Sequence, residues 1–228
     1  MSRRTAAALA AVALLMSLTG CFGGDTTTDE IAYRIDESIT ALVIGARAAS
    51  VDIVTADGPV AVTEEHRYSD NKPTTAHQVE GTTLRLTESG CGNDDVRCEV
   101  HYRIQLPAPT SVEITAQAGS VKLNGVAGKI QVTTEAASVE ALALTSDAVT
   151  IKSEVGAASL EFTEAPTLVS ATTSMGAVDL KVPGTTAYAV DVRGKVGAEK
   201  VRVEQDPASA HRIEVRTEVG AVQIEPLP

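Results

Sequence analysis

The sequence predicts an all-β protein, and three of its features support that fold class. From residue 31 onward apolar and polar residues alternate two by two, as in Val112-Glu113-Ile114 and Val149-Thr150-Ile151. This alternation is typical of strands with one buried and one solvated face. The strand-favouring residues Val, Ile and Thr are abundant. A corner of small residues followed by an alternating pair also recurs, at a spacing of about 20 residues, which predicts a β-solenoid whose stacked coils share one core.

The recurring corners share a small residue, Gly or Ala, directly before or at a sharp bend. They are Ala49-Ser50-Val51, Gly119-Ser120-Val121, Ala137-Ser138-Val139, Ala158-Ser159-Leu160, Gly176-Ala177-Val178, Gly197-Ala198-Glu199 and Gly220-Ala221-Val222. Aligning them places Val121, Val139, Leu160, Val178, Val201 and Val222 in one apolar column. A β-sandwich also alternates short strands with turns, and it stays open as the alternative fold.

The N-terminus has the features of an export signal. Arg3 and Arg4 precede the apolar run of residues 6–18, which is short for a membrane-spanning helix. The segment Leu18-Thr19-Gly20-Cys21 then resembles the bacterial lipobox. That resemblance implies removal of residues 1–20 as a signal peptide and acylation of Cys21, which becomes the first mature residue. The acyl chains would hold the protein in membrane lipid on the extracytoplasmic face of the bacterial cell membrane.

The rest of the chain divides into three expected parts. Residues 21–30 are expected to form a flexible tether, since they are polar and rich in Gly and Thr. Residues 31–105 repeat less clearly and are expected to supply the first β coils and an end cap. Residues 106–228 are expected to form the repeat solenoid, with the two prolines of residues 225–228 protecting an open edge from further strand pairing.

Two cysteines remain once Cys21 is assigned to lipid. Cys91 and Cys98 enclose a short polar loop, and an even count in an exported chain favours a disulfide between them. A metal site using both thiolates and His101, with Asp94 nearby, is the alternative. It lacks a clear fourth ligand and the compartment is oxidising, so the disulfide is favoured.

Composition narrows the possible functions. The chain has 228 residues, a net charge of −11 and only six aromatic residues, four Tyr and two Phe. This acidic balance argues against nucleic acid as a partner, because phosphate binding needs basic stripes. We found no nucleophile elbow, zinc-protease motif, phosphate loop or dinucleotide fingerprint, so we predict no catalytic residues, no cofactor and no enzymatic activity. The four histidines, His66, His77, His101 and His211, are each expected at the surface or at a strand edge.

Three acidic residues define the one candidate cation site. If the coils stack as the corners suggest, Glu140, Glu161 and Asp179 form an outward ladder flanked by Lys122 and Arg202. Such a ladder could bind Ca²⁺, and a carbohydrate-active enzyme on a solenoid scaffold is the third and least favoured function for the chain. The alternative is a solvated charged face, and the extra residue in Gly156-Ala157-Ala158-Ser159 puts the shared register in question.

The repeats resemble the putative-adhesin family of bacterial surface proteins, a domain of unknown function. The resemblance covers about residues 40–226. It rests on the Gly-Ala/Ser-Val corners, on Gln105-Leu106-Pro107-Ala108 and on residues 121–128, while Ala49 and Ala137 replace the family's usual glycine. It implies a non-enzymatic, lipid-anchored surface module that binds an unknown surface ligand. An accessory or sensor lipoprotein that docks onto a membrane protein is the alternative.

Overall fold

The computed structural model describes residues 26–92 and 98–227, and all regular structure within them is β. The all-β prediction is therefore confirmed. The strands are β1 (Thr27–Ile35), β2 (Ala41–Thr55), β3 (Val60–Tyr68), β4 (Thr75–Glu80), β5 (Thr83–Glu88), β6 (Cys98–Leu106), β7 (Ser111–Asn124), β8 (Ile130–Leu144), β9 (Ala148–Val155), β10 (Ala158–Phe162), β11 (Leu168–Met175), β12 (Val178–Pro183), β13 (Ala189–Val196), β14 (Glu199–Val201), β15 (Arg212–Val219) and β16 (Val222–Leu227). No helix in the described residues is long and apolar enough to cross a membrane.

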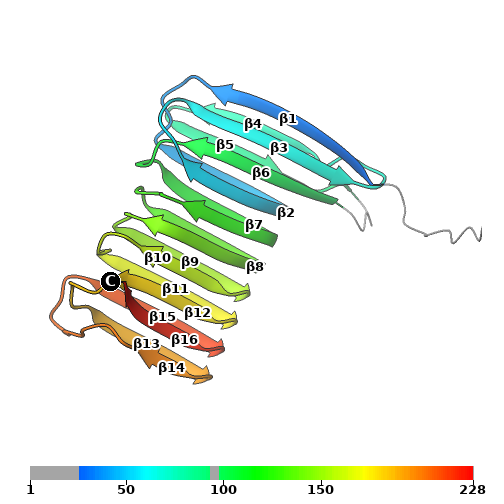
Figure 1. Cartoon of the computed structure of the whole chain (residues 1–228). Helices are drawn as coiled ribbons and strands as arrows, with labels where there is room; N and C mark the ends of the chain where they lie inside the picture. Colours follow the sequence, from blue (N-terminus) through cyan, green and yellow to red (C-terminus); the bar gives the residue numbers. More distant parts are fainter. Residues whose placement is uncertain (1–25, 93–97, 228) are drawn as a thin grey trace, which may run out of the picture.

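The sixteen strands form one mixed sheet that is folded into two layers (Figure 1). Layer A has the order β4-β5-β2-β7-β8-β9-β11-β15-β13, and layer B the order β1-β3-β6-β2-β7-β8-β10-β12-β16-β14. The long strands β2, β7 and β8 belong to both layers, because their first halves pair in layer A and their second halves in layer B. We call the edge at which the chain passes from layer A to layer B the corner edge. Inward side chains of both layers form a single apolar core.

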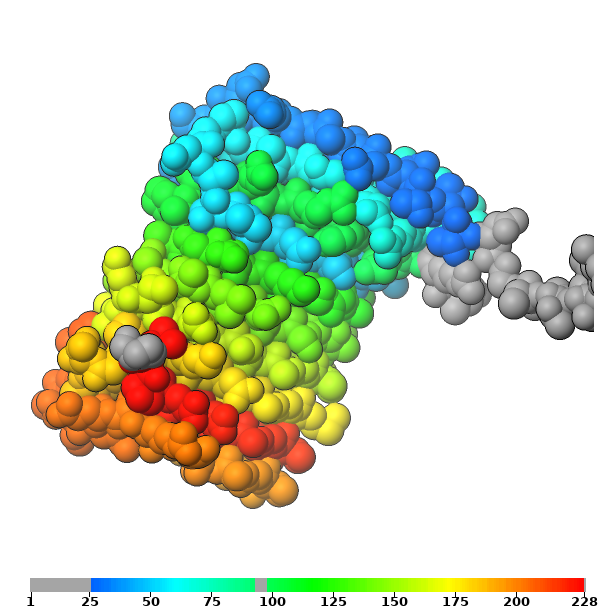
Figure 2. All heavy atoms as spheres, viewed as in Figure 1, coloured from blue at the N-terminus to red at the C-terminus, as the bar shows by residue number. Residues whose placement is uncertain are grey.

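Successive repeats pair parallel and side by side, but the order at both ends is permuted. The β2 repeat lies between β7 and the later β5–β6 repeat, and the C-terminal β15–β16 repeat lies between β11–β12 and the earlier β13–β14. Figure 2 shows this inversion, with β16 in red between neighbours in yellow and orange. The prolines near the C-terminus therefore do not guard an open edge as expected. The edge is formed by β13 and β14, and Pro226 lies beyond the short stretch of β16 that β14 covers.

The register corrects the predicted alignment at two corners. Val121 pairs with Val139 and Val178 with Val222, as expected, but Ala158 rather than Leu160 is opposite Val139, and Glu199 rather than Val201 is opposite Val222. The pairing runs without a shift through this corner, from Val155 opposite Ala136 to Ala158 opposite Val139, so the corner begins at Gly156. A register shift occurs only farther along β10, against the end of β8, where Ala143 has a φ of 52°. The chain thus absorbs each irregularity locally and keeps its inward residues apolar.

Glycine at the corner is required where neighbouring backbones nearly touch. Gly119 has a φ of +133°, and a Cβ added there would lie 1.9 Å from the carbonyl oxygen of Ala49. Gly156 meets the carbonyl of Ala137 in the same way, at 2.0 Å. Ala49 and Ala137 themselves do not adopt positive φ, so these two corners accept alanine. Every corner beyond β8 carries a glycine, at Gly156, Gly176, Gly220 and Gly197, where an added Cβ would lie within 2.0 Å of a neighbouring carbonyl oxygen.

Three antiparallel strands, β1, β3 and β4, close the N-terminal end, and we call them the cap. Strand β1 begins at Thr27, so the last four residues of the expected tether are part of the fold. They are held there because residues 27–35 pair with β3 along their whole length. The other predicted domain boundaries stay predictions.

Candidate functional site

A groove of about 660 Å³ crosses five neighbouring strands of layer A beside the corner edge. It lies over β2, β7, β8, β9 and β11, and strands in a sheet are about 4.8 Å apart, so its long axis covers roughly 19 Å. Because the strands run across it, β2, β7, β8 and β9 each contribute the same two outward positions, and β11 contributes one. We call it the corner groove.

Hydroxyl groups dominate one wall of the corner groove. The register brings Gly45, Thr115, Thr133, Lys152 and Thr172 into one row. Gly45 leaves open space in this row, since a Cβ there would meet nothing within 4 Å. The row therefore offers hydroxyl groups and one ammonium group at regular intervals.

The other wall carries the last polar residue before each corner: Arg47, Gln117, Glu135 and Glu154. Glu135, Glu154 and Lys152 are in no ion pair within the part of the chain that the structure describes. The groove thus presents donors and acceptors of both charges that are not committed to each other. Such a lining suits an extended polar ligand held by hydrogen bonds.

The floor of the groove is formed by small inward residues whose polar atoms are satisfied. Thr134 donates a hydrogen bond to Ser153 Oγ at 3.1 Å, and Ser153 donates to the carbonyl of Ala137 at 3.4 Å. At one end the buried carboxylate of Glu88 accepts hydrogen bonds from the backbone N–H groups of Arg47 and Ala48, at 2.8 and 2.9 Å, and from that of Gly90. These groups fix the floor and are not available to a ligand.

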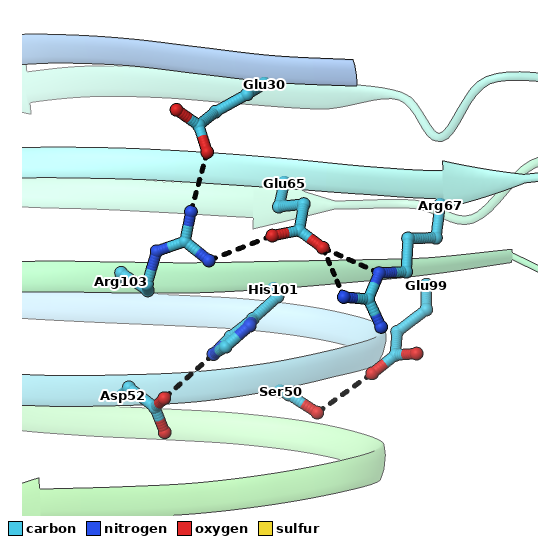
Figure 3. A network of polar contacts seen from close by, with 8 residues as sticks. All are labelled: Glu30, Ser50, Asp52, Glu65, Arg67, Glu99, His101 and Arg103. Carbon is cyan, nitrogen blue, oxygen red and sulfur yellow. Dashed lines mark hydrogen bonds and ion pairs between the residues drawn. The ribbon is translucent and has the colours of Figure 1, made fainter. Parts of the chain in front are cut away.

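A second polar region lies on the outer face of β1, β3, β6 and β2 (Figure 3). Unlike those of the corner groove, its charged side chains are paired with each other. Arg103 bridges Glu30 and Glu65 at 2.7 and 2.9 Å, and Arg67 binds Glu65 from the other side. Hydrogen bonds from Arg103 and Arg67 hold the pKa of Glu65 below its ordinary value. We call these four side chains the charge network, and it ties the cap to the first coil.

Two further polar pairs lie beside the charge network. His101 contacts Asp52 at 2.9 Å, and Ser50 donates to Glu99 at 3.0 Å (Figure 3). The Ser50 hydroxyl is therefore already hydrogen-bonded to the carboxylate of Glu99. We assign these pairs to holding β6 against β2, since each joins one strand to the other.

The histidine prediction is wrong for His66, which is buried at 1% exposure. Its Nε2 lies 3.1 Å from Glu64, whose other oxygen accepts a hydrogen bond from the Tyr33 hydroxyl at 2.6 Å. Burial and the hydrogen bond to Glu64 raise the pKa of Tyr33. The strict alternation of Val60 and Val62 with outward residues could have revealed that positions 64 and 66 point inward. His77 is exposed, while His101 and His211 are half-buried.

The acidic ladder of Glu140, Glu161 and Asp179 does not form. Ser159, rather than Glu161, lies opposite both Glu140 and Asp179, because the corner of this coil begins at Gly156, two residues before the predicted position. Glu161 instead pairs with Lys181 at 3.4 Å. Of the expected flanking cations, Lys122 is opposite Glu140, but Arg202 pairs with Glu225. No group of three His, Cys, Asp or Glu residues that could hold a metal ion occurs in residues 26–92 and 98–227.

The predicted disulfide is confirmed: Cys91 and Cys98 are bonded, with their Cα atoms 5.8 Å apart. It closes the loop that leads from β5 in layer A to β6 in layer B at the corner edge. Cys21 lies outside the described residues, so its acylation stays a prediction. Sequence reasoning missed the corner groove, whose only signal is a Thr four positions before three of the corners, at Thr115, Thr133 and Thr172.

Comparison with known proteins supports the fold. No family model and no curated protein sequence matches the chain. A putative cell adhesion protein from Clostridium sporogenes is similar in structure, with 14% identity, a TM-score of 0.50, and coverage of 88% of this chain and 100% of that one. Putative adhesins from Bacteroides fragilis (11% identity, TM-score 0.45, 90% and 99% covered) and Parabacteroides distasonis (15%, 0.30, 90% and 98%) also match. At these identities the likeness to the Clostridium protein concerns the fold alone.

Proposed function

We propose that the protein is a non-enzymatic, lipid-anchored binding module on the extracytoplasmic face of a bacterial membrane, with the corner groove as its ligand site. The observation that carries the proposal is the groove itself, a trough across five strands whose charged walls are not paired with each other. The structurally similar protein from Clostridium sporogenes is described as a putative cell adhesion protein, which agrees with a surface binding role.

The scaffold suits such a role. We interpret the in-register parallel repeats as a β-solenoid with permuted end coils. Each coil hydrogen-bonds to its neighbours, so the groove walls are held at fixed spacing before a ligand arrives. A preformed site loses little conformational entropy on binding.

Anchoring through Cys21 would keep the domain close to the bilayer. Four residues lie between Cys21 and Thr26, and the five Cα-to-Cα steps of this segment span about 17 Å when fully extended. The corner groove lies beside the corner edge, where Thr26 also lies, next to Ala48 and Ala118. This position favours the second candidate function, docking onto a membrane protein, because the groove would be close to the lipid surface.

The anchor is tested by Cys21→Ser. We expect the variant to leave the membrane fraction entirely, because the acyl chains supply the attachment and the acidic domain does not favour anionic lipid. Fractionation of cells followed by a high-salt wash measures this. Sedimentation of Cys21→Ser with washed membranes would contradict the anchor.

The groove is tested by photocrosslinking on intact cells from a reactive amino acid placed at Gln117. The matched control carries the same group at Lys122, on the outer face of layer B of the same strand. Repeated capture of one membrane protein from position 117 alone would favour the docking function. Capture of wall polymer would favour adhesion, and equal capture from both positions would remove the groove as the ligand site.

A further inference from the structure

The exposed large apolar side chains of this protein are concentrated in one row. Among the described residues only six such side chains are exposed, and four of them are Val155, Met175, Val219 and Val196, at 46%, 53%, 50% and 62%. They come from β9, β11, β15 and β13, and the register places them next to one another in that order. We call them the apolar row.

The apolar row occupies the same position in every coil, the last residue before the corner glycine. Each member begins a Val-Gly-Ala or Met-Gly-Ala segment, so an alanine follows the glycine in all four coils. The equivalent residues of the earlier coils are Ala48, Ala118 and Ala136. This one position is therefore apolar in all the repeats from β2 to β13, and the four repeats farthest from the cap carry the large side chains.

The chain enters the fold at this same edge. Thr26 lines a hollow of about 420 Å³ together with Ala48, Ala118 and Gly119. In Figure 1 the start of β1 lies on the side of the molecule at which β2, β7 and β8 turn from layer A to layer B. From Ala118 the row begins two strands away, at Val155, which is about 10 Å.

We propose that the corner edge is the membrane-facing side of the anchored protein and that the apolar row lies in the lipid headgroup region. The inference rests on the proposed anchor at Cys21, which would hold Thr26 and the neighbouring edge within about 17 Å of the bilayer. At the millimolar effective concentration that a short tether gives, a weak affinity is sufficient to keep the row on the surface.

The charged side chains around the apolar row determine whether zwitterionic or anionic lipid is favoured. Glu154 and Glu218 directly precede Val155 and Val219, and Lys195 is paired with Glu218 at 2.7 Å. These side chains can stay at the aqueous rim while the row enters the interface. Because the rim and the whole chain are acidic, contact with zwitterionic lipid is favoured over contact with anionic lipid.

The chain has no tryptophan, so a single one reports its own surroundings. Full-length lipoprotein carrying Met175→Trp is reconstituted into phosphatidylcholine vesicles with and without brominated acyl chains. The matched control is Glu164→Trp, an exposed position in the turn between β10 and β11 at the opposite edge. We expect brominated lipid to quench Met175→Trp at least twofold and to leave Glu164→Trp unchanged. Adding Val155→Glu and Val219→Glu to Met175→Trp should abolish the quenching, which shows that the row, and not the indole alone, makes the contact.

The outcomes separate the two proposals. Protein that floats with the vesicles but shows no quenching at position 175 overturns the membrane-facing edge and leaves the anchor intact. Protein that does not float with the vesicles overturns both. A blue-shifted, unquenched Met175→Trp whose emission depends on protein concentration assigns the row to contact between two copies of the chain, and also overturns the proposal.

Discussion

The parallel repeats, which we call the stack, and the interior beneath the cap carry different polar side chains at their inward positions. In the stack, inward polar groups are hydroxyls that hydrogen-bond to the next coil, as Thr173 does to the carbonyl of Gly156 at 3.3 Å. Beneath the cap the inward positions carry Glu64, His66 and Tyr102. Inside the stack, the neighbouring coil supplies hydrogen-bond partners for the polar groups of each coil. The outermost coil has a neighbour on one side only, so side chains supply the missing partners.

Carboxylates at both ends illustrate this difference. Glu88 accepts the corner N–H groups of β2, where β5 does not continue through the corner. At the other end Glu199 accepts the N–H of Gly194 on the edge strand β13 at 2.8 Å. Both ends therefore use a glutamate where an interior coil would use a backbone carbonyl.

The largest effect is expected within the stack, from Gly119→Ala. The added Cβ would lie 1.9 Å from the Ala49 carbonyl oxygen in a backbone with φ of +133°, so neighbouring coils must separate. We expect a loss of about 3–5 kcal/mol in the free energy of unfolding, from backbone strain together with overpacking. Chemical denaturation measures it. Gly45→Ala is the control, because its Cβ would enter open space, and an equal loss there would show that the corner contact is not the cause.

The second effect concerns the loop that leads into β6. Replacing both Cys91 and Cys98 with Ser removes a link across a separation of seven residues. We expect a loss of about 2–3 kcal/mol, because the unfolded chain gains loop entropy. Thermal unfolding of the variant measures this, and membrane attachment should not change. A larger loss would mean that the stack depends on the cap and does not fold separately from it.

Glu88→Gln tests the junction between cap and stack. The amide retains one acceptor but directs an N–H₂ group toward the backbone N–H groups that the carboxylate binds. We expect a loss of about 1–3 kcal/mol, in line with an unsatisfied buried donor. Urea denaturation measures the loss, and Glu113→Gln, on the outer face of layer A, serves as the exposed control. Equal stability of Glu88→Gln and the native chain would contradict the capping role.

The sequence was sufficient to predict the strands and corners of the stack, but not the strand order and the buried polar residues at its ends. Alternation identified the strands, and Gly119 and Gly176 marked real corners. The permuted order of β13–β14 and β15–β16 was not predictable, because parallel coils of similar composition can exchange places without changing which residues are buried. The alternation of β3 places positions 64 and 66 inward, but the hydrogen bond from Tyr33 to Glu64 was not predictable, because the two residues are 31 positions apart. The corner groove forms only when five strands lie in register. Its row residues Thr115, Thr133, Lys152 and Thr172 are unevenly spaced along the chain, so no repeat of fixed length reveals them.

The smallest effect is expected from the charge network on the surface of the cap. Arg103 and Arg67 hold the pKa of Glu65 below its ordinary value of 4.5, so the ionised form stabilises the fold. This contribution is fully present above about pH 4.5, the pKa in the unfolded chain, and it is lost as the pH falls through the lower folded pKa. We therefore expect Glu65→Gln to unfold at a lower temperature than the native chain at pH 7 and at the same temperature near pH 2.

Asp191→Asn, which removes an exposed pair with Arg193 on the edge strand β13, should show the same pH trend. Glu65 pairs with Arg67 on its own strand and with Arg103 on β6, whereas Asp191 pairs with Arg193 within its own strand. A larger difference for Glu65→Gln would therefore show that the surface charges stabilise the cap more than the stack. Equal differences would contradict this distinction between the cap and the stack.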